Sequence, residues 1–233
     1  MEEMYLDGRA LLRLGTASPE VLLLQCVDEA DESGLGEEFS LLEASGLRFS
    51  LLALRIADWN GELSPWRAPP VFGKIPFAGK APKTLAFIED RVLPFAFETL
   101  GKPLPVILGG YSLAGLFALW ASTGTDAFSG AAAASPSVWF PGFREYIAAH
   151  PPKAKRVYLS LGDKEERAKN KVMATVGENI RAIASALPGE IASTLEMNPG
   201  NHFVDAPLRT AKAFLWASAP CEQTKREAAP GSF

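Results

Sequence analysis

The chain has 233 residues and a mass of 25.0 kDa, with 48% hydrophobic and 21% charged residues. This is enough apolar material for one sizeable core, so we expect a single globular domain over residues 1–217. The net charge of −4 provides no positive surface for a phosphate backbone or an anionic membrane, and nucleic acid and membrane partners are therefore not expected.

The first third of the chain predicts two buried strands, a helix and a long loop. A near-continuous apolar run at 21–27 predicts a strand covered on both faces, and the acidic residues after it predict a solvated loop. Helical apolar spacing predicts a helix over 36–45, and residues 47–56 predict a second buried strand. Residues 57–81 contain four prolines and several aromatics, which indicates a functional rather than a disordered loop.

From residue 82 onward, helices and strands alternate. A helix begins at Pro82, is expected to kink at Pro94 and ends at Gly101. The elements that follow are strand 105–109, helix 113–122, strand 129–135, helix 143–149, strand 157–161, helix 172–187, strand 191–197 and helix 208–217. This alternation predicts a mostly parallel sheet with helices on both faces, and the polar tail 218–233 is expected to be disordered.

The segment GGYSLAG at 109–115 lies between a strand and a helix and predicts a nucleophile elbow. Such a turn strains the backbone of its central serine, and small residues two positions before and after it avoid a clash. Gly110 and Ala114 meet that need. Ser112 is therefore the candidate nucleophile, and the amide of Leu113 is a candidate oxyanion donor at the helix N-terminus. A tight loop without chemistry is the simpler alternative.

A serine hydroxyl needs an imidazole to take its proton, and the chain has two histidines. His202 follows the last predicted strand, where a triad histidine belongs, whereas His150 precedes two prolines and is expected at the surface. The acid is expected in the loop GDKEE after strand 157–161. Both Glu165 and Asp163 are candidates, and the sequence leaves the choice between them open.

Cysteine usage and the N-terminus indicate a reducing cytosol and no export. Cys26 and Cys221 are far apart and belong to no CxxC or Cys/His cluster. Arg9 and Arg13 precede any long apolar stretch, which is not the order of a secretory signal. The most apolar run, 106–120, is interrupted by glycines and is shorter than the roughly 20 residues that a bilayer span needs.

The chain resembles the esterase branch of the α/β-hydrolase superfamily, which includes enterochelin esterases, related siderophore hydrolases and, more distantly, esterase D and mycolyltransferases. The resemblance spans about residues 20–217 and rests on GGYSLAGLFALW, SPSVWF, GDKEE, NPGNHF and the helix PKTLAFIEDRVLPF. It implies an α/β-hydrolase fold with Ser112 as nucleophile, His202 as general base and Glu165 or Asp163 as acid. It also implies that the amide of Leu113 donates to the oxyanion.

Two features depart from that family. Relatives tend to have Asp-Gly or His-Gly after the first core strand, where this chain has residues 25–28, so the second oxyanion donor is expected to be the amide of Cys26 or Val27. Losing one such donor typically lowers turnover about 10²–10³-fold. The first edge strands are also nearly absent from residues 5–17, and no separate cap domain is visible.

Aromatic residues on the loops expected around Ser112 together favour an apolar substrate pocket, although core packing is the favoured explanation for any single one. The candidates for this pocket are Trp59, Trp66, Trp139 and Phe140. No phosphate loop, metal cluster or dinucleotide fingerprint is present, so no cofactor is expected.

The sequence thus predicts a serine hydrolase that cleaves a small-molecule carboxylic ester through an acyl-enzyme. Acyl transfer or thioester hydrolysis at the same site is the close alternative. A catalytically silent binding protein with a hydrolase fold is the alternative from another class. The sequence indicates neither the natural substrate nor the oligomeric state.

Overall fold

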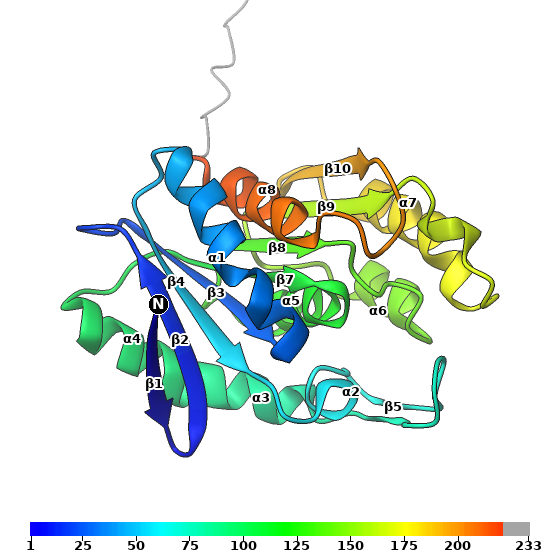
Figure 1. Cartoon of the computed structure of the whole chain (residues 1–233). Coiled ribbons are helices and arrows are strands. Elements are labelled where there is room, and N and C mark those ends of the chain that lie inside the picture. Colours follow the sequence, from blue (N-terminus) through cyan, green and yellow to red (C-terminus); the bar gives the residue numbers. More distant parts are fainter. Residues whose placement is uncertain (221–233) are drawn as a thin grey trace, which may run out of the picture.

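The computed structural model describes residues 1–220, in which eight strands form one sheet in the order β1-β2-β4-β3-β7-β8-β9-β10 (Figure 1). The strands are β1 (Glu2–Leu6), β2 (Arg9–Gly15), β3 (Val21–Val27), β4 (Phe49–Arg55), β7 (Val106–Tyr111), β8 (Gly130–Ala134), β9 (Arg156–Gly162) and β10 (Ala192–Asn198). Strands β4, β3, β7, β8, β9 and β10 are parallel to one another, whereas β2 is antiparallel to both β1 and β4.

Helices cover both faces of this sheet. They are α1 (Glu29–Ala44), α2 (Trp59–Glu62), α3 (Ala81–Phe87), α4 (Leu93–Leu100), α5 (Ser112–Gly124), α6 (Phe143–Ala149), α7 (Val176–Ala186) and α8 (Ala206–Ser218). Helices α1 and α8 lie side by side over one face, and α5 lies on the other (Figure 1). The predicted α/β-hydrolase fold, a mostly parallel sheet with helices on both faces, is confirmed.

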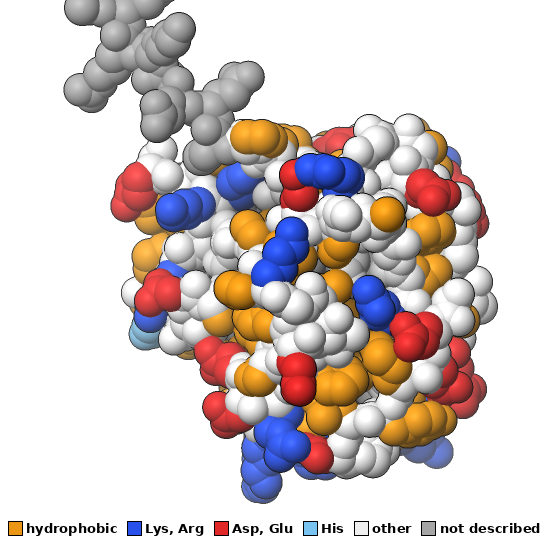
Figure 2. Space-filling view, turned by 90° about the vertical axis from the view of Figure 1, so that its left-hand side faces the viewer, with side chains coloured by type: hydrophobic (Ala, Val, Ile, Leu, Met, Phe, Trp, Pro, Cys, Tyr) orange, Lys and Arg blue, Asp and Glu red, His pale blue; other side chains and the backbone are white. Residues whose placement is uncertain are grey.

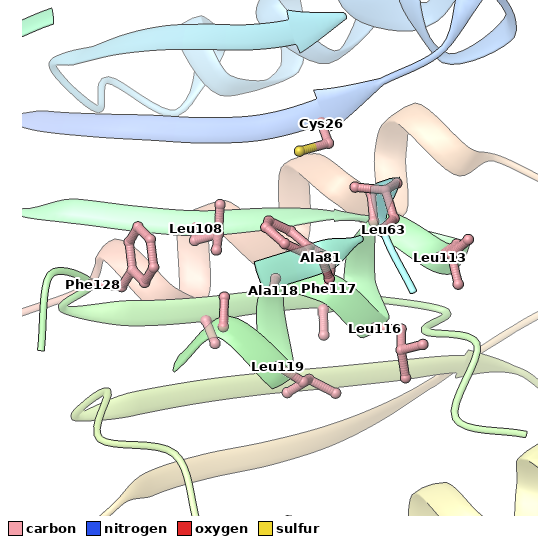
Figure 3. Close-up of a cluster of buried hydrophobic side chains, with 14 of the residues drawn as sticks. Cys26, Leu63, Ala81, Leu108, Leu113, Leu116, Phe117, Ala118, Leu119 and Phe128 are labelled. Atoms are coloured by element: carbon pink, nitrogen blue, oxygen red, sulfur yellow. The ribbon is translucent and has the colours of Figure 1, made fainter. Parts of the chain in front are cut away.

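The alternation of apolar side chains along the central strands builds two cores. Leu22 and Leu24 of β3 join the core under α5, whereas Leu23 joins the core under α8. Figure 3 shows Phe117 of α5 in the first of these cores, together with the Cys26 side chain. Burial raises the pKa of the Cys26 thiol to about 12, so this cysteine is a core residue and not a nucleophile.

The first edge strands are present, and the prediction that residues 5–17 nearly lack them is wrong. β1 and β2 form a hairpin whose turn is Asp7-Gly8, with φ values of +49° and +79°. Asp-Gly is a strong signal for this turn type. The strand pattern was weak because β1, at the edge of the sheet, is largely exposed and carries polar side chains on both faces.

The acidic run after β3 is helical and is not the solvated loop that the sequence predicted. α1 begins at Glu29, ahead of the predicted start at residue 36. The Asp28 carboxylate accepts the Asp31 amide at 2.9 Å, which satisfies one of the free amides of the first turn. Acidic side chains are stabilised at a helix N-terminus, so composition alone was misleading here.

The predicted long loop and kinked helix both contain additional local structure. Residues 57–81 include α2 and a two-stranded sheet of β5 (Arg67–Ala68) and β6 (Phe77–Ala78). The helix expected from residue 82 contains a π-helical stretch, η1 (Ile88–Val92), between α3 and α4. Pro94 removes a backbone donor next to this stretch, which accounts for the irregularity predicted there.

The surface at the left of Figure 1 mixes acidic, basic and apolar side chains, and neither charge gathers into a patch on that face (Figure 2). None of the helices within residues 1–220 is long and apolar enough to cross a membrane. The tail predicted to be disordered lies mostly outside the described residues, and α8 extends to Ser218.

Candidate active site

Ser112 lies at the sharp turn where β7 ends and α5 begins, at the carboxyl edge of the parallel strands. Its φ of +57° is in the left-handed region, which is costly for a residue with a side chain. Gly110 has a φ of +152°, and a Cβ there would lie 2.6 Å from the Cβ of Ala114. This is the geometry of a nucleophile elbow, and it explains why small residues flank the serine.

Three side chains form a hydrogen-bonded chain at this turn. His202, in the loop between β10 and α8, places Nε2 3.0 Å from the Ser112 hydroxyl. Its Nδ1 lies 2.7 Å from Oε2 of Glu165, which follows β9 in the short 3₁₀ helix η2 (Glu165–Arg167). When Nδ1 donates its proton to the carboxylate, Nε2 is left to accept the proton of the serine.

Of the two acid candidates, the structure brings Glu165 to His202 and not Asp163. Glu165 is 7% exposed, and its Oε1 accepts the Gly162 amide at 2.7 Å. Burial acts to raise the pKa of Glu165, but the hydrogen bond and charge of His202 outweigh it and hold this pKa below its usual range. The exposed Asp163 carboxylate instead accepts the Gly200 amide at 2.8 Å.

Arg209 of α8 is a buried cation at this site, and it is not among the residues predicted from the sequence. Its guanidinium is 1% exposed and donates to Oε1 of Glu165 at 3.0 Å. A sequence signal existed, because Arg209, Ala213 and Ala217 recur every four residues and all face the core. An arginine on the apolar side of a helix needs internal acceptors.

The amide of Val27 is not placed to hold an oxyanion at Ser112. The Leu22 amide donates to the Pro105 carbonyl at 2.9 Å, so the even-numbered amides of β3 face β7 and the odd-numbered ones face β4. The Val27 amide therefore faces β4, on the side where the Val27 carbonyl accepts the Ile56 amide at 2.9 Å. The prediction that the Val27 amide is the second oxyanion donor is therefore wrong, because this amide points toward β4 within the sheet.

The amide of Cys26 faces β7, directly after the pair that Gln25 forms with Gly109, so it too belongs to the sheet. Leu113 differs, because the second residue of a helix has no acceptor for its amide within that helix. Ser137 adds a hydroxyl 3.2 Å from the Ser112 hydroxyl, and its amide donates to the Ser112 carbonyl at 3.0 Å. The segment SPSVWF, which contains Ser137, is part of the family resemblance, but no role for Ser137 was predicted from it.

A cavity of about 410 Å³ adjoins the hydrogen-bonded chain. Its lining includes His202 and Glu165, and its largest apolar side chains are Trp139, Met173 and Phe203. Phe203 is 89% exposed and meets the His202 ring edge-on, with ring centroids 5.6 Å apart. An apolar group of a ligand has room here, directly beside the imidazole.

Of the four aromatics predicted to line a pocket, only Trp139 lines this one. Phe140 is buried and packs edge-on against Trp66, whose indole N–H donates to the Pro141 carbonyl at 3.0 Å. Trp59 lines a separate groove of about 980 Å³ near the β1-β2 hairpin. For Trp66 and Phe140, the alternative of loop and core packing applies.

A second cavity, of about 290 Å³ and lined largely by polar side chains, adjoins Tyr111 and lies between β3, α1 and α8. Burial raises the pKa of Glu38 there to about 8, and burial together with the charge of Asp28 raises that of Asp31 to about 7. The charge of His202 acts in the opposite direction on Asp31. Since the folded state keeps protons that the unfolded chain has lost, these two carboxyls reduce stability as the pH rises toward 8.

The fold agrees with solved structures, whereas sequence comparison finds nothing: no family model and no curated protein matches the chain. An IroE-like serine hydrolase from Shewanella oneidensis is 17% identical, with a TM-score of 0.75 over 89% of this chain and 75% of that one. The siderophore hydrolase EstA from Aspergillus nidulans is 21% identical, with a TM-score of 0.69 over 91% and 92% of the two chains.

The siderophore hydrolase EstB from the same fungus is 16% identical, with a TM-score of 0.70 over 94% of this chain and 95% of that one. At these identities the similarity shows a shared fold.

Within residues 1–220, no three His, Cys, Asp or Glu side chains lie close enough together to hold a metal ion.

Proposed function

We propose that this protein is a serine hydrolase that cleaves a carboxylic ester through an acyl-enzyme. The observation that carries the proposal is the chain from Glu165 through His202 to Ser112, with heavy-atom separations of 2.7 and 3.0 Å. A nucleophile, a base and an orienting acid within hydrogen-bond distance are what acyl transfer from an ester requires.

In the first half-reaction, Ser112 Oγ attacks the ester carbonyl carbon while His202 Nε2 takes its proton. The Leu113 amide donates to the oxyanion, and the Glu165 carboxylate stabilises the imidazolium. The tetrahedral intermediate collapses, the C–O bond to the alcohol breaks, and His202 returns the proton to the leaving alkoxide. A water molecule, deprotonated by the same imidazole, then attacks the acyl carbonyl carbon. The C–O bond to Ser112 breaks, His202 returns the proton to Ser112 Oγ, and the acid is released.

The proposed substrate is a small-molecule ester with an apolar group, because Trp139, Met173 and Phe203 line the cavity beside His202. Structural neighbours described as siderophore hydrolases and as an enterobactin esterase support an ester in that role. No step of this mechanism uses a metal or an organic cofactor. We propose the cytosol as the compartment because the cysteine usage, including the free and buried Cys26, suits a reducing environment.

The acyl-enzyme itself can be trapped. Rapid mixing with p-nitrophenyl butyrate and acid quenching are expected to leave a butyryl group on the peptide that contains Ser112, and an initial burst of p-nitrophenol is expected whenever deacylation is the slower step. Mass spectrometry of the quenched protein identifies the acylated residue. An acyl group on any other residue would rule out the proposed mechanism, and so would a burst of p-nitrophenol that leaves no acyl group on the protein.

Removing the Phe203 ring is expected to weaken catalysis on esters with longer acyl chains. In Phe203→Ala, kcat/KM for p-nitrophenyl hexanoate should fall about fivefold to tenfold through lost apolar contact, and that for the acetate should stay within twofold. Met197→Ala is the matched control, because Met197 is an exposed apolar side chain of neighbouring β10 that does not line the cavity. Equal losses on acetate and hexanoate would contradict this assignment.

A further inference from the structure

The guanidinium of Arg209 joins segments that are far apart in the chain. Besides Glu165, Nη1 donates to the hydroxyl groups of Tyr111 and Ser135, each at 3.1 Å. Nη2 donates to the carbonyls of Pro199 at 2.9 Å and Asn201 at 3.1 Å. One side chain therefore bonds to the ends of β7 and β8, to the acid and to the loop that carries the histidine.

These acceptors lie next to the side chains that the proposed reaction needs at fixed positions, those of Ser112, Glu165 and His202. Pro199 and Asn201 precede His202 in its loop, which turns at Gly200 with a φ of +96°. The Tyr111 hydroxyl, which accepts from Arg209, itself donates to the His202 carbonyl at 2.8 Å. Arg209 is thus connected to His202 both through its loop and through the residue that precedes the nucleophile.

Burying a guanidinium this completely is costly unless nearly all its N–H groups find acceptors. Here the two terminal nitrogens contact five acceptors. All of them except the Ser135 hydroxyl belong to Glu165 itself or to the segments that precede Ser112 and His202. A planar fork reaches acceptors on two sides at fixed angles, which a single ammonium group cannot do. The guanidinium shape is therefore used for geometry and not only for charge.

We propose that Arg209 is a positioning residue: its guanidinium holds the Glu165 carboxylate and the 199–201 loop in the arrangement in which His202 reaches both Glu165 and Ser112. The inference rests on the proposed function. Arg209 contacts neither of the two atoms that exchange the proton, so its effect passes through Glu165 and the histidine loop. Misplacing a base by about 1 Å can cost about 10²-fold in rate, and this sets the size of the expected effect.

The test compares Arg209→Gln and Arg209→Lys with Arg156→Gln in the full chain. Arg156 is the matched control because it also binds α8, donating Nε and Nη2 to the Trp216 carbonyl at 3.2 and 3.0 Å, but away from the site. For each variant, kcat and KM are measured with p-nitrophenyl butyrate, and the urea midpoint is measured in parallel.

We expect Arg209→Gln to lower kcat about 100-fold with KM within threefold of the wild type, and Arg209→Lys to lower kcat at least about tenfold. Arg156→Gln should keep the wild-type kcat even where its urea midpoint falls. A merely structural role would move the midpoint of the Arg209 variants without this split between kcat and KM. If Arg209→Gln does not fold, Arg209→Lys decides.

Wild-type turnover in either folded Arg209 variant would overturn the positioning role and leave the proposed function intact. A wild-type protein without any ester turnover would instead contradict the proposed function. The two failures are therefore distinguishable in one set of assays.

Discussion

Replacing His202 with alanine is expected to reduce ester turnover at least about 10⁴-fold, because the Ser112 hydroxyl then has no base to take its proton. The matched control is His150→Ala, which removes the other histidine of the chain. His150 is exposed, and its Nδ1 lies 3.0 Å from the Tyr146 carbonyl at the end of α6. Its loss should leave kcat within twofold.

The measurement is kcat with p-nitrophenyl butyrate for the two variants, after circular dichroism has verified that both are folded. If His202→Ala kept more than a few per cent of wild-type turnover, the imidazole would not be the base. A comparable loss in His150→Ala would indicate that the assay reports protein stability and not chemistry.

Replacing Glu165 with glutamine is expected to lower kcat by about 10³–10⁴-fold, while Asp163→Asn stays within threefold. A glutamine amide at 165 can place its N–H₂ toward Nδ1, which favours the wrong tautomer of His202. The Asp163→Asn side chain keeps an oxygen for the Gly200 amide and should preserve the loop. The two positions share one loop, so the pair of variants separates the contacts of Glu165 with His202 and Arg209 from the general effect of removing a carboxylate from this loop.

The Glu165→Gln variant also has a pH-dependent signature in stability. The pKa of Glu165 is lowered in the folded state, so ionised Glu165 contributes stability above its unfolded pKa and loses it as the pH falls through the folded value. The stability difference between wild type and Glu165→Gln should therefore shrink on acidification. Urea unfolding at several acidic pH values measures this stability difference, and a difference that grows instead would show that the carboxylate is not stabilised by its neighbours.

Unchanged kcat in Glu165→Gln with a collapse of kcat in Asp163→Asn would reverse the assignment of the acid.

The parts of the site that follow local rules could be predicted from the sequence. Ser112 was identified because the steric demands of an elbow act on residues within two positions of it, where they leave a readable pattern. His202 was identified because strand order sets the place of the loop after β10. The alternating elements likewise predicted the parallel sheet, since each buried strand carries its own apolar run.

The parts that depend on packing across the sheet could not be predicted. Glu165 and Asp163 are two residues apart, and only the folded structure shows that Glu165 is the one buried against His202 and Arg209. The prediction of the Val27 amide as oxyanion donor is wrong because successive amides of a strand point alternately toward its two neighbouring strands. Which amides of β3 face β7 depends on the strand register, which the sequence does not show. Arg209 lies on the apolar side of α8, but its acceptors become apparent only once α8 is placed against the ends of β7 and β8.

The central claim is that Ser112 is an activated nucleophile. Labelling the wild-type protein with a fluorophosphonate probe, with Ser112→Ala and His202→Ala as controls, tests it without knowledge of the substrate. We predict one adduct, mapped by mass spectrometry to Ser112, that is lost in Ser112→Ala and strongly slowed in His202→Ala. Folded wild-type protein that stays unlabelled, or that labels equally fast without His202, would contradict the account.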